Sequence, residues 1–98
     1  PYLEPKSPNS QLKYRFRVDG LAVGEVITAY GFLVNGQAFT SGTVDGLQFV
    51  SVDSDGNDEV SLELNAGTLN ATYLITFWYS TSVVARHEQS VKLPVRKV

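Results

Sequence analysis

The sequence predicts an all-β protein: a single antiparallel β-sandwich of six or seven strands, preceded by an extended N-terminal arm. Short segments in which hydrophobic and polar residues alternate recur along the chain, and a period of two is typical of strands with one buried face. Turn-forming residues separate these segments, and no long segment shows a helical period. The chain has 98 residues, of which 43% are hydrophobic and 18% charged, so one globular domain is expected.

Residues 1–10 are predicted to form the arm and residues 11–98 the sandwich. Three of the four prolines lie in the arm, and proline fixes its own φ and favours extended backbone before it. Tyr2 and Leu3 are hydrophobic residues near the tip of the arm. We expect the arm to become ordered only in an assembly, with both side chains in a groove of a neighbouring protein. The alternative is that the arm covers the sheet of its own domain.

Residue patterns predict the strands in the following order along the chain. Residues 12–18 form the clearest strand, because hydrophobic residues alternate there with basic ones. Residues 25–34 form the next strand, but hydrophobic residues occur at both parities. Either this strand is central and covered on both faces, or a bulge near Gly31 changes its register. A long loop follows at 35–46, with a short strand near 38–40 as the optional seventh. Further strands are predicted at 47–52, 60–64, 72–80 and 91–95, with a polar turn at 53–58 and a loop at 83–87.

The segment 64–81 indicates which type of sandwich is present. A turn that contains Gly67 is followed by Tyr73, which opens a strand. This is the arrangement of the tyrosine corner in immunoglobulin-like sandwiches, where the ring enters the core and the hydroxyl bonds to upstream backbone. We therefore predict an immunoglobulin-like fold. The ring of Tyr73 should be buried, and its hydroxyl should bond to backbone within about five residues upstream.

The same strand predicts candidate interaction residues. If Tyr73 faces the core, Leu74 and Trp78 face outward, and large exposed hydrophobic side chains tend to mark interaction surfaces. The alternative is that the arm or the long loop covers Trp78. Arg86 and His87, in the predicted surface loop, complete the set of candidate protein-interaction residues, which is Tyr2, Leu3, Leu74, Trp78, Arg86 and His87.

Basic and acidic residues are segregated along the sequence. All eight Lys and Arg residues lie before residue 18 or after residue 85, whereas the segment between them holds eight of the ten acids. One interpretation is that bases on edge strands discourage edge-to-edge aggregation. The other is a bipolar subunit whose basic side meets the acidic side of a neighbour, as in a ring.

Several residue patterns that are typical of enzymes are missing from the sequence. Cysteine is absent and His87 is the only histidine, which excludes metal sites built from several of these residues. No nucleophile elbow, phosphate-binding loop or dinucleotide motif occurs. The turn from Asp53 to Asp58 has the carboxylates of a calcium loop, but its glycine does not fit the EF-hand spacing, and a hairpin turn is favoured. We therefore predict no enzyme activity, no cofactor and no metal. We also predict no nucleic-acid binding, since a pI of about 5.2 lacks the basic character of such proteins. No membrane span is predicted, since no hydrophobic run approaches roughly 20 residues.

Four segments follow one another in a familiar order. They are a P-x-S step at residues 5–7, the step Gly24-Glu25-Val26-Ile27, a strand pair at 60–76 and a closing hairpin at 81–95. Together they resemble the small immunoglobulin-like phage proteins described as fiber-tail adaptors. The resemblance covers about two-thirds of the chain and leaves residues 31–56 unaccounted for. The family's Gly-Arg after the final Thr-Ser is replaced here by residues 83–86.

The resemblance implies a non-enzymatic structural protein of a bacteriophage virion, assembled in the host cytoplasm, which attaches fibers or spikes to the tail. The implied partners are other virion proteins: the tail tube, nozzle or adaptor ring, and the tail fiber. Several copies are implied, in a ring or attached to one. One alternative is another phage surface, neck or capsid-decoration sandwich. Another is a carbohydrate-binding module, which would need exposed aromatic residues such as Trp78, Tyr79 and Tyr30.

Overall fold

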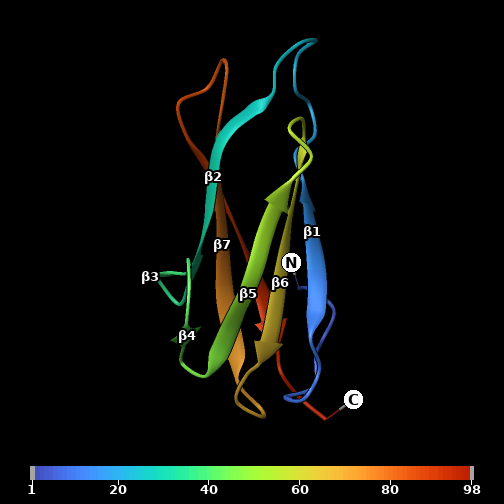
Figure 1. Cartoon of the computed structure of the whole chain (residues 1–98), viewed down its shortest axis with the longest axis vertical. Coiled ribbons are helices and arrows are strands. Elements are labelled where there is room, and N and C mark those ends of the chain that lie inside the picture. The colour runs from blue at the N-terminus through green and yellow to red at the C-terminus, as the bar shows by residue number, and fades with distance from the viewer. Residues whose placement is uncertain (1, 98) are drawn as a thin grey trace.

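Two antiparallel four-stranded sheets make up the protein (Figure 1). The computed structural model describes residues 2–97, and no helix occurs among them. One sheet has the order β1-β6-β5-β4. Its strands are β1 (Leu12–Arg17), β6 (Glu59–Ala66), β5 (Leu47–Ser54) and β4 (Thr43–Val44). The other has the order β3-β2-β7-β8. Its strands are β3 (Gln37–Ala38), β2 (Ile27–Val34), β7 (Thr72–Thr81) and β8 (His87–Pro94). The predicted all-β antiparallel class is confirmed.

The hydrophobic core lies between the two sheets, as in a β-sandwich. Phe16 from one sheet contacts Phe32 and Phe77 from the other, with ring centroids 5.1 and 5.4 Å apart. Alternate residues of β6 and β7 point into this layer and are almost fully buried. They are Val60, Leu62, Leu64, Tyr73, Ile75, Phe77 and Tyr79. The period of two in the sequence therefore marks the buried face, and each large side chain buried there contributes about 1.5–3 kcal/mol relative to exposure.

Tyr73 occupies the position that the sequence predicts. Its ring is 1% exposed. Its hydroxyl accepts a hydrogen bond from the backbone N–H of Thr68, five residues upstream, at 2.9 Å, and donates one to the carbonyl of Asp45 at 2.6 Å. The turn before it contains Gly67 with φ at +108°, a conformation that favours glycine. The prediction for Tyr73 is confirmed, and its hydroxyl ties the β6–β7 turn to the β4–β5 turn.

The strands differ from the prediction in three respects. The register of β2 shifts between Ile27 and Ala29, so the bulge lies at Thr28 and not near Gly31. This bulge lets Ile27 and Phe32 both face the core although they have opposite parity. The predicted long loop contains two short strands, β3 and β4, which bring the total among the described residues to eight. Finally, β8 begins at His87, four residues before the predicted start at residue 91.

The N-terminal arm lies along the free edge of β8. Tyr2 and Lys6 form parallel bridges with Lys92 and Val95 of the same chain, and the N–H of Leu3 donates to the carbonyl of Lys92 at 2.8 Å. The prediction that the arm is ordered only in an assembly is therefore wrong; the arm covers an edge of its own domain. The physical reason is burial that the sequence analysis missed. Leu3 packs against the core, and Lys6 is only 1% exposed.

Lys6 anchors the arm through both parts of its side chain. Its aliphatic stem is buried, and its ammonium group donates hydrogen bonds to the carbonyls of Ser7, at 2.7 Å, and Ala66. Burial lowers the pKa of Lys6 below its usual value, because removal from water disfavours the charged form. The buried amine is satisfied by backbone carbonyls of two separate segments, so the arm is fixed to the β6–β7 turn.

Basic residues near the start of the sequence lie beside acidic residues from its middle in the folded chain. β1 and β8 are the edge strands of different sheets and are not hydrogen-bonded neighbours. In the β1–β6 register, Lys13 lies opposite Glu63 and Arg17 opposite Glu59. The Arg17 guanidinium also lies 3.4 Å from the carboxylate of Asp58. The outer face of this sheet therefore alternates both signs of charge and is not a purely basic face.

Candidate interaction surface

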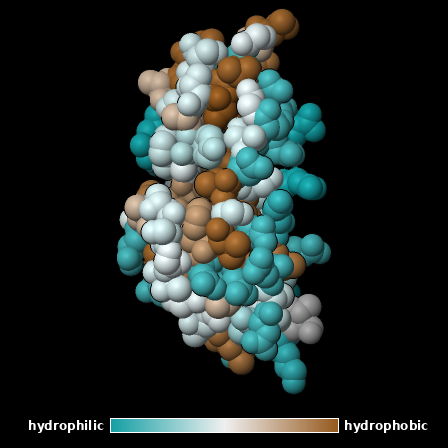
Figure 2. All heavy atoms as spheres, viewed as in Figure 1, coloured by the Kyte–Doolittle hydropathy of each residue, from teal (hydrophilic) through white to brown (hydrophobic). Residues whose placement is uncertain are grey.

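The outer faces of the two sheets differ in chemistry. Figure 2 views the molecule from the side of the β1-β6-β5-β4 sheet and shows hydrophilic residues along the border that β1 forms. The opposite sheet presents Leu74, Thr76 and Trp78 from β7 to the outside, flanked by β2 and β8. On that face the charged side chains of β8 stand at the border. The outer face of β2, β7 and β8 is therefore the less charged of the two.

Trp78 lies on this face, on the central strand β7, and is held from both sides. It pairs with Gly31 of β2, where an added Cβ atom would lie 2.5–2.7 Å from three atoms of the indole. The guanidinium of Arg86 lies 4.5 Å from the centroid of the ring, on the outside. Arg86 in turn forms a 3.0 Å ion pair with Glu88, which pairs with Trp78 in the register. The indole is thus half-buried over β2 backbone, and it is Arg86, not the arm or the long loop, that covers it.

A second cluster lies along the same face, toward the arm. Leu74 is 43% exposed and pairs with Lys92 of β8. Lys92 places its ammonium 5.7 Å from the ring centroid of Tyr2, which is 69% exposed. Exposed aromatic and aliphatic side chains beside charged ones are typical of protein-binding surfaces.

The structure thus brings together four of the six predicted interaction residues. Tyr2, Leu74, Trp78 and Arg86 gather on the outer face of β7 and β8 and its arm. Leu3 does not join them, because it packs against the core. His87 also lies apart, since it stacks on the ring of Tyr79 with a 5.5 Å centroid separation.

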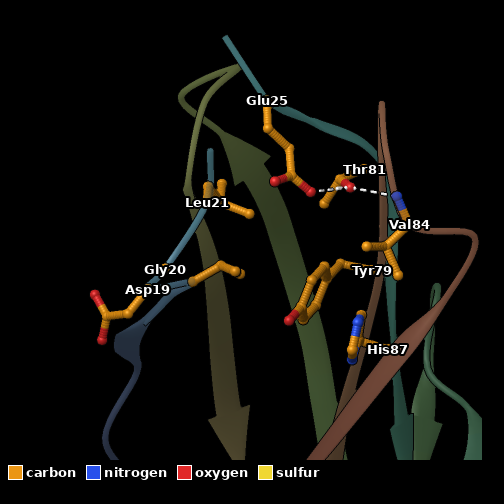
Figure 3. Close-up of a pocket in the computed structure, with 9 residues that line it drawn as sticks. Asp19, Gly20, Leu21, Glu25, Tyr79, Thr81, Val84 and His87 are labelled. Carbon is orange, nitrogen blue, oxygen red and sulfur yellow. Dashed lines mark hydrogen bonds between the residues drawn. The ribbon is translucent and has the colours of Figure 1, made fainter. Parts of the chain in front are cut away.

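His87 lines a pocket of about 200 Å³ at the end of the sandwich (Figure 3). Glu25 lines one end of this pocket, and its side chain points toward Thr81 (Figure 3). Its carboxylate accepts hydrogen bonds from the Thr81 hydroxyl at 2.5 Å and from the Ala22 N–H at 3.0 Å. These bonds, first that from Thr81, lower the pKa of Glu25. The Thr81 hydroxyl oxygen also accepts the N–H of Val84 at 2.9 Å. Both oxygens of Glu25 are engaged, and the pocket is below the roughly 300 Å³ of typical ligand sites. Its polar groups tie the two end loops together.

The polar turn between β5 and β6 is a hairpin turn, as predicted. One carboxylate oxygen of Asp55 accepts the N–H groups of Asn57, Asp58 and Glu59 at 2.8–3.1 Å. These hydrogen bonds lower the pKa of Asp55. Its carboxylate therefore closes the turn. Within residues 2–97, no group of three His, Cys, Asp or Glu side chains is arranged to hold a metal ion.

Sequence reasoning missed three residues that shape the surface. Gly31 provides the space for the Trp78 ring, and Thr76 and Ser90 join β7 to β8 through a 2.9 Å hydrogen bond between their hydroxyls. A pairing of residues 31 and 78 would have indicated the role of Gly31, but a single sequence does not specify which strands pair.

No protein-family model and no curated protein matches the chain. Across residues 2–97 the structure has no helix long and apolar enough to cross a membrane.

Proposed function

We propose that this protein is a non-enzymatic structural component of a bacteriophage virion, with an immunoglobulin-like sandwich, and that it attaches fibers or spikes to the tail. Its partners in this proposal are the tail tube, nozzle or adaptor ring on one side and the tail fiber on the other. The motif order of the fiber-tail adaptors supports this proposal. So does the tyrosine corner, because its Tyr73 stands in the strand pair that the resemblance includes.

The observation on which the proposal depends most is the gathering of Tyr2, Leu74, Trp78 and Arg86 on one outer face. Trp, Tyr and Arg are the residues most often found at the energetic centres of protein interfaces. The pocket near His87, by contrast, has its carboxylate engaged in hydrogen bonds between loops. The chemistry of the surface therefore supports binding of protein partners.

A neck or capsid-decoration protein is the second candidate, because it would use the same kind of surface elsewhere on the virion. A carbohydrate-binding module is less well supported. Sugar rings stack on free aromatic faces, but the indole of Trp78 lies between Gly31 and Arg86. Of the other two candidates, Tyr79 is 7% exposed and Tyr30 is half-buried.

The test is to delete the gene from the phage that encodes the protein and to image the particles. We expect tailed particles without fibers or spikes, and full restoration when wild-type protein is added. Leu74→Glu should fail to restore attachment, whereas Val50→Glu should restore it. The two residues are matched, since they are 43% and 39% exposed and lie on opposite sheets. Particles that keep their fibers without the protein, or labelled protein found on the head, would overturn the tail assignment.

A further inference from the structure

We infer that the outer face of β7 and β8 binds a second copy of this chain, in a two-fold dimer with the sheets face to face. The two-fold axis would cross the strands at the level of Thr76 and Ser90, so that strands of the two copies run in opposite directions. The inference takes from the proposed function only that this face binds protein.

The outward side chains of β7 and β8 form two matched rows. On β7 the row is Leu74, Thr76 and Trp78, and on β8 the residues opposite them are Lys92, Ser90 and Glu88. Large side chains stand at both ends of the β7 row, and a small one stands in the middle. Rotation about the proposed axis places Trp78 of one copy, with the Arg86 guanidinium that covers its outer side, opposite Leu74 of the other copy, twice. The pattern is therefore complementary to itself, as a two-fold contact requires.

The charges of β8 select this orientation. The same rotation places Glu88 of each copy opposite Lys92 of the other, which gives two pairs of opposite charge. A face-to-face contact with strands in the same direction would set β8 on β2, whose residues in this stretch are uncharged. Lys92 would then be covered without a partner of opposite charge, and Glu88 would keep only its pair with Arg86 of its own chain, which is less favourable.

The centre of the face, at Thr76 and Ser90, can be covered by a partner at little desolvation cost. Thr76 is only 8% exposed although it points outward, and its hydroxyl is already bonded to that of Ser90 at 2.9 Å. Leu33 of β2, which pairs with Thr76, is half-buried beside it. Polar groups that are already paired cost little to cover, whereas an unpaired hydroxyl would cost more.

The other outer face lacks these features. Its charged rows on β1 and β6 already oppose one another within the chain, with Lys13 opposite Glu63 and Arg17 opposite Glu59. A second copy bound there would find no charge without a partner of opposite sign to pair with, and it would remove many charged side chains from water. The two faces therefore differ in what lies opposite their charges on the neighbouring strand: Glu88 faces Trp78 and Lys92 faces Leu74, whereas the charges of β1 face charges of opposite sign.

Analytical ultracentrifugation of the purified chain tests the inference through charge reversal. Glu88→Lys and Lys92→Glu each turn two attractive contacts into two repulsive ones, so each variant alone should dimerise at least about tenfold more weakly than wild type. An equimolar mixture of the two variants should associate again, because every contact then joins opposite charges. The double variant should also dimerise. Arg15→Glu, on the opposite sheet, serves as the control and should leave the dimer unchanged.

A monomer at all concentrations would overturn the inference, as would open-ended association or a mixture of variants that stays monomeric. Leu74→Glu provides a second test, since it should abolish the dimer while thermal melting of the chain stays intact. These measurements use the protein alone. A protein that is monomeric in solution but still restores fibers to particles would refute the dimer and leave the proposed function standing. A protein that dimerises but is not needed for fiber attachment would refute the proposed function and leave the dimer standing.

Discussion

The substitution Tyr73→Phe removes one oxygen atom from a fully buried ring and tests how the two turns at this end of the domain are held. The hydroxyl accepts from the Thr68 N–H at 2.9 Å and donates to the Asp45 carbonyl at 2.6 Å. The ring remains, so no cavity is formed. The Asp45 carbonyl keeps a longer contact with the Thr68 hydroxyl at 3.3 Å, but the N–H of Thr68 loses this acceptor. Both hydrogen bonds are part-buried, and each is worth about 0.5–1.5 kcal/mol net, so we expect a loss of about 2 kcal/mol.

The loss is measured by urea unfolding and thermal melting, where about 2 kcal/mol should lower Tm by roughly 8–16 °C in a domain of this size. Tyr79→Phe is the matched control. Its ring is also buried, at 7% exposure, but its hydroxyl reaches the pocket at the end of the sandwich (Figure 3). We expect a change below about 0.5 kcal/mol for this variant. Equal effects of the two substitutions would show that the Tyr73 hydroxyl does not join the turns.

Three further substitutions test other contacts. Gly31→Val should displace the only tryptophan, because its Cβ would lie 2.5–2.7 Å from the Trp78 indole; we expect a loss of roughly 1–3 kcal/mol and a red-shifted emission maximum, and unchanged emission would contradict this. Burial, and then the charge of Glu4, raise the pKa of Tyr14 from 10.0 to about 12. The stability that this pKa shift contributes is complete below pH 10 and is lost as the pH rises through 12. The unfolding free energy of Tyr14→Phe should therefore fall less steeply between these pH values than that of wild type. An equally steep fall in both proteins would refute this role of Tyr14. The pKa of Asp55 is lowered below 3.8 by its three N–H donors, so its contribution is present above that pH and is lost on acidification. Asp55→Ala should therefore reduce stability at pH 7 and lose less of it in acid, whereas parallel pH curves for variant and wild type would exclude the role assigned to this turn.

The strands that the sequence predicted well are those with one buried face and one solvated face. Residues 12–18 and 60–64 lie in this situation, so the requirement to bury one side leaves a period of two in the sequence. The position of Tyr73 followed from the same rule combined with the preceding turn. In such segments the burial of alternate side chains determines both the local sequence pattern and the packing of the strand, so the strand can be predicted from a single sequence.

The remaining elements depend on partners that are distant in sequence. The first half of β8, from His87, is exposed on both faces at the sheet edge, so no hydrophobic pattern marks it. The arm was missed because Lys6 looks like a surface residue until the carbonyl of Ala66 is placed beside it. At the surface, parity predicted that Trp78 points outward, but Arg86 covers it from a loop whose path no periodicity specifies.

The pairing of β1 with β6 and of β2 with β7 also determines when this protein can fold during its synthesis. Leu12 pairs with Leu64, so at 5–20 residues per second the ribosome needs roughly 3–10 s to supply the partner of β1 after β1 itself. Throughout this interval the hydrophobic row of β1 has no sheet to join. The hairpins β5–β6 and β7–β8 are local, but the sheets close only around strands made much earlier, and such long-range pairing is slow. Lys13, Arg15 and Arg17 alternate with the hydrophobic residues of β1, and charged residues on such a strand oppose its pairing with the strands of other chains.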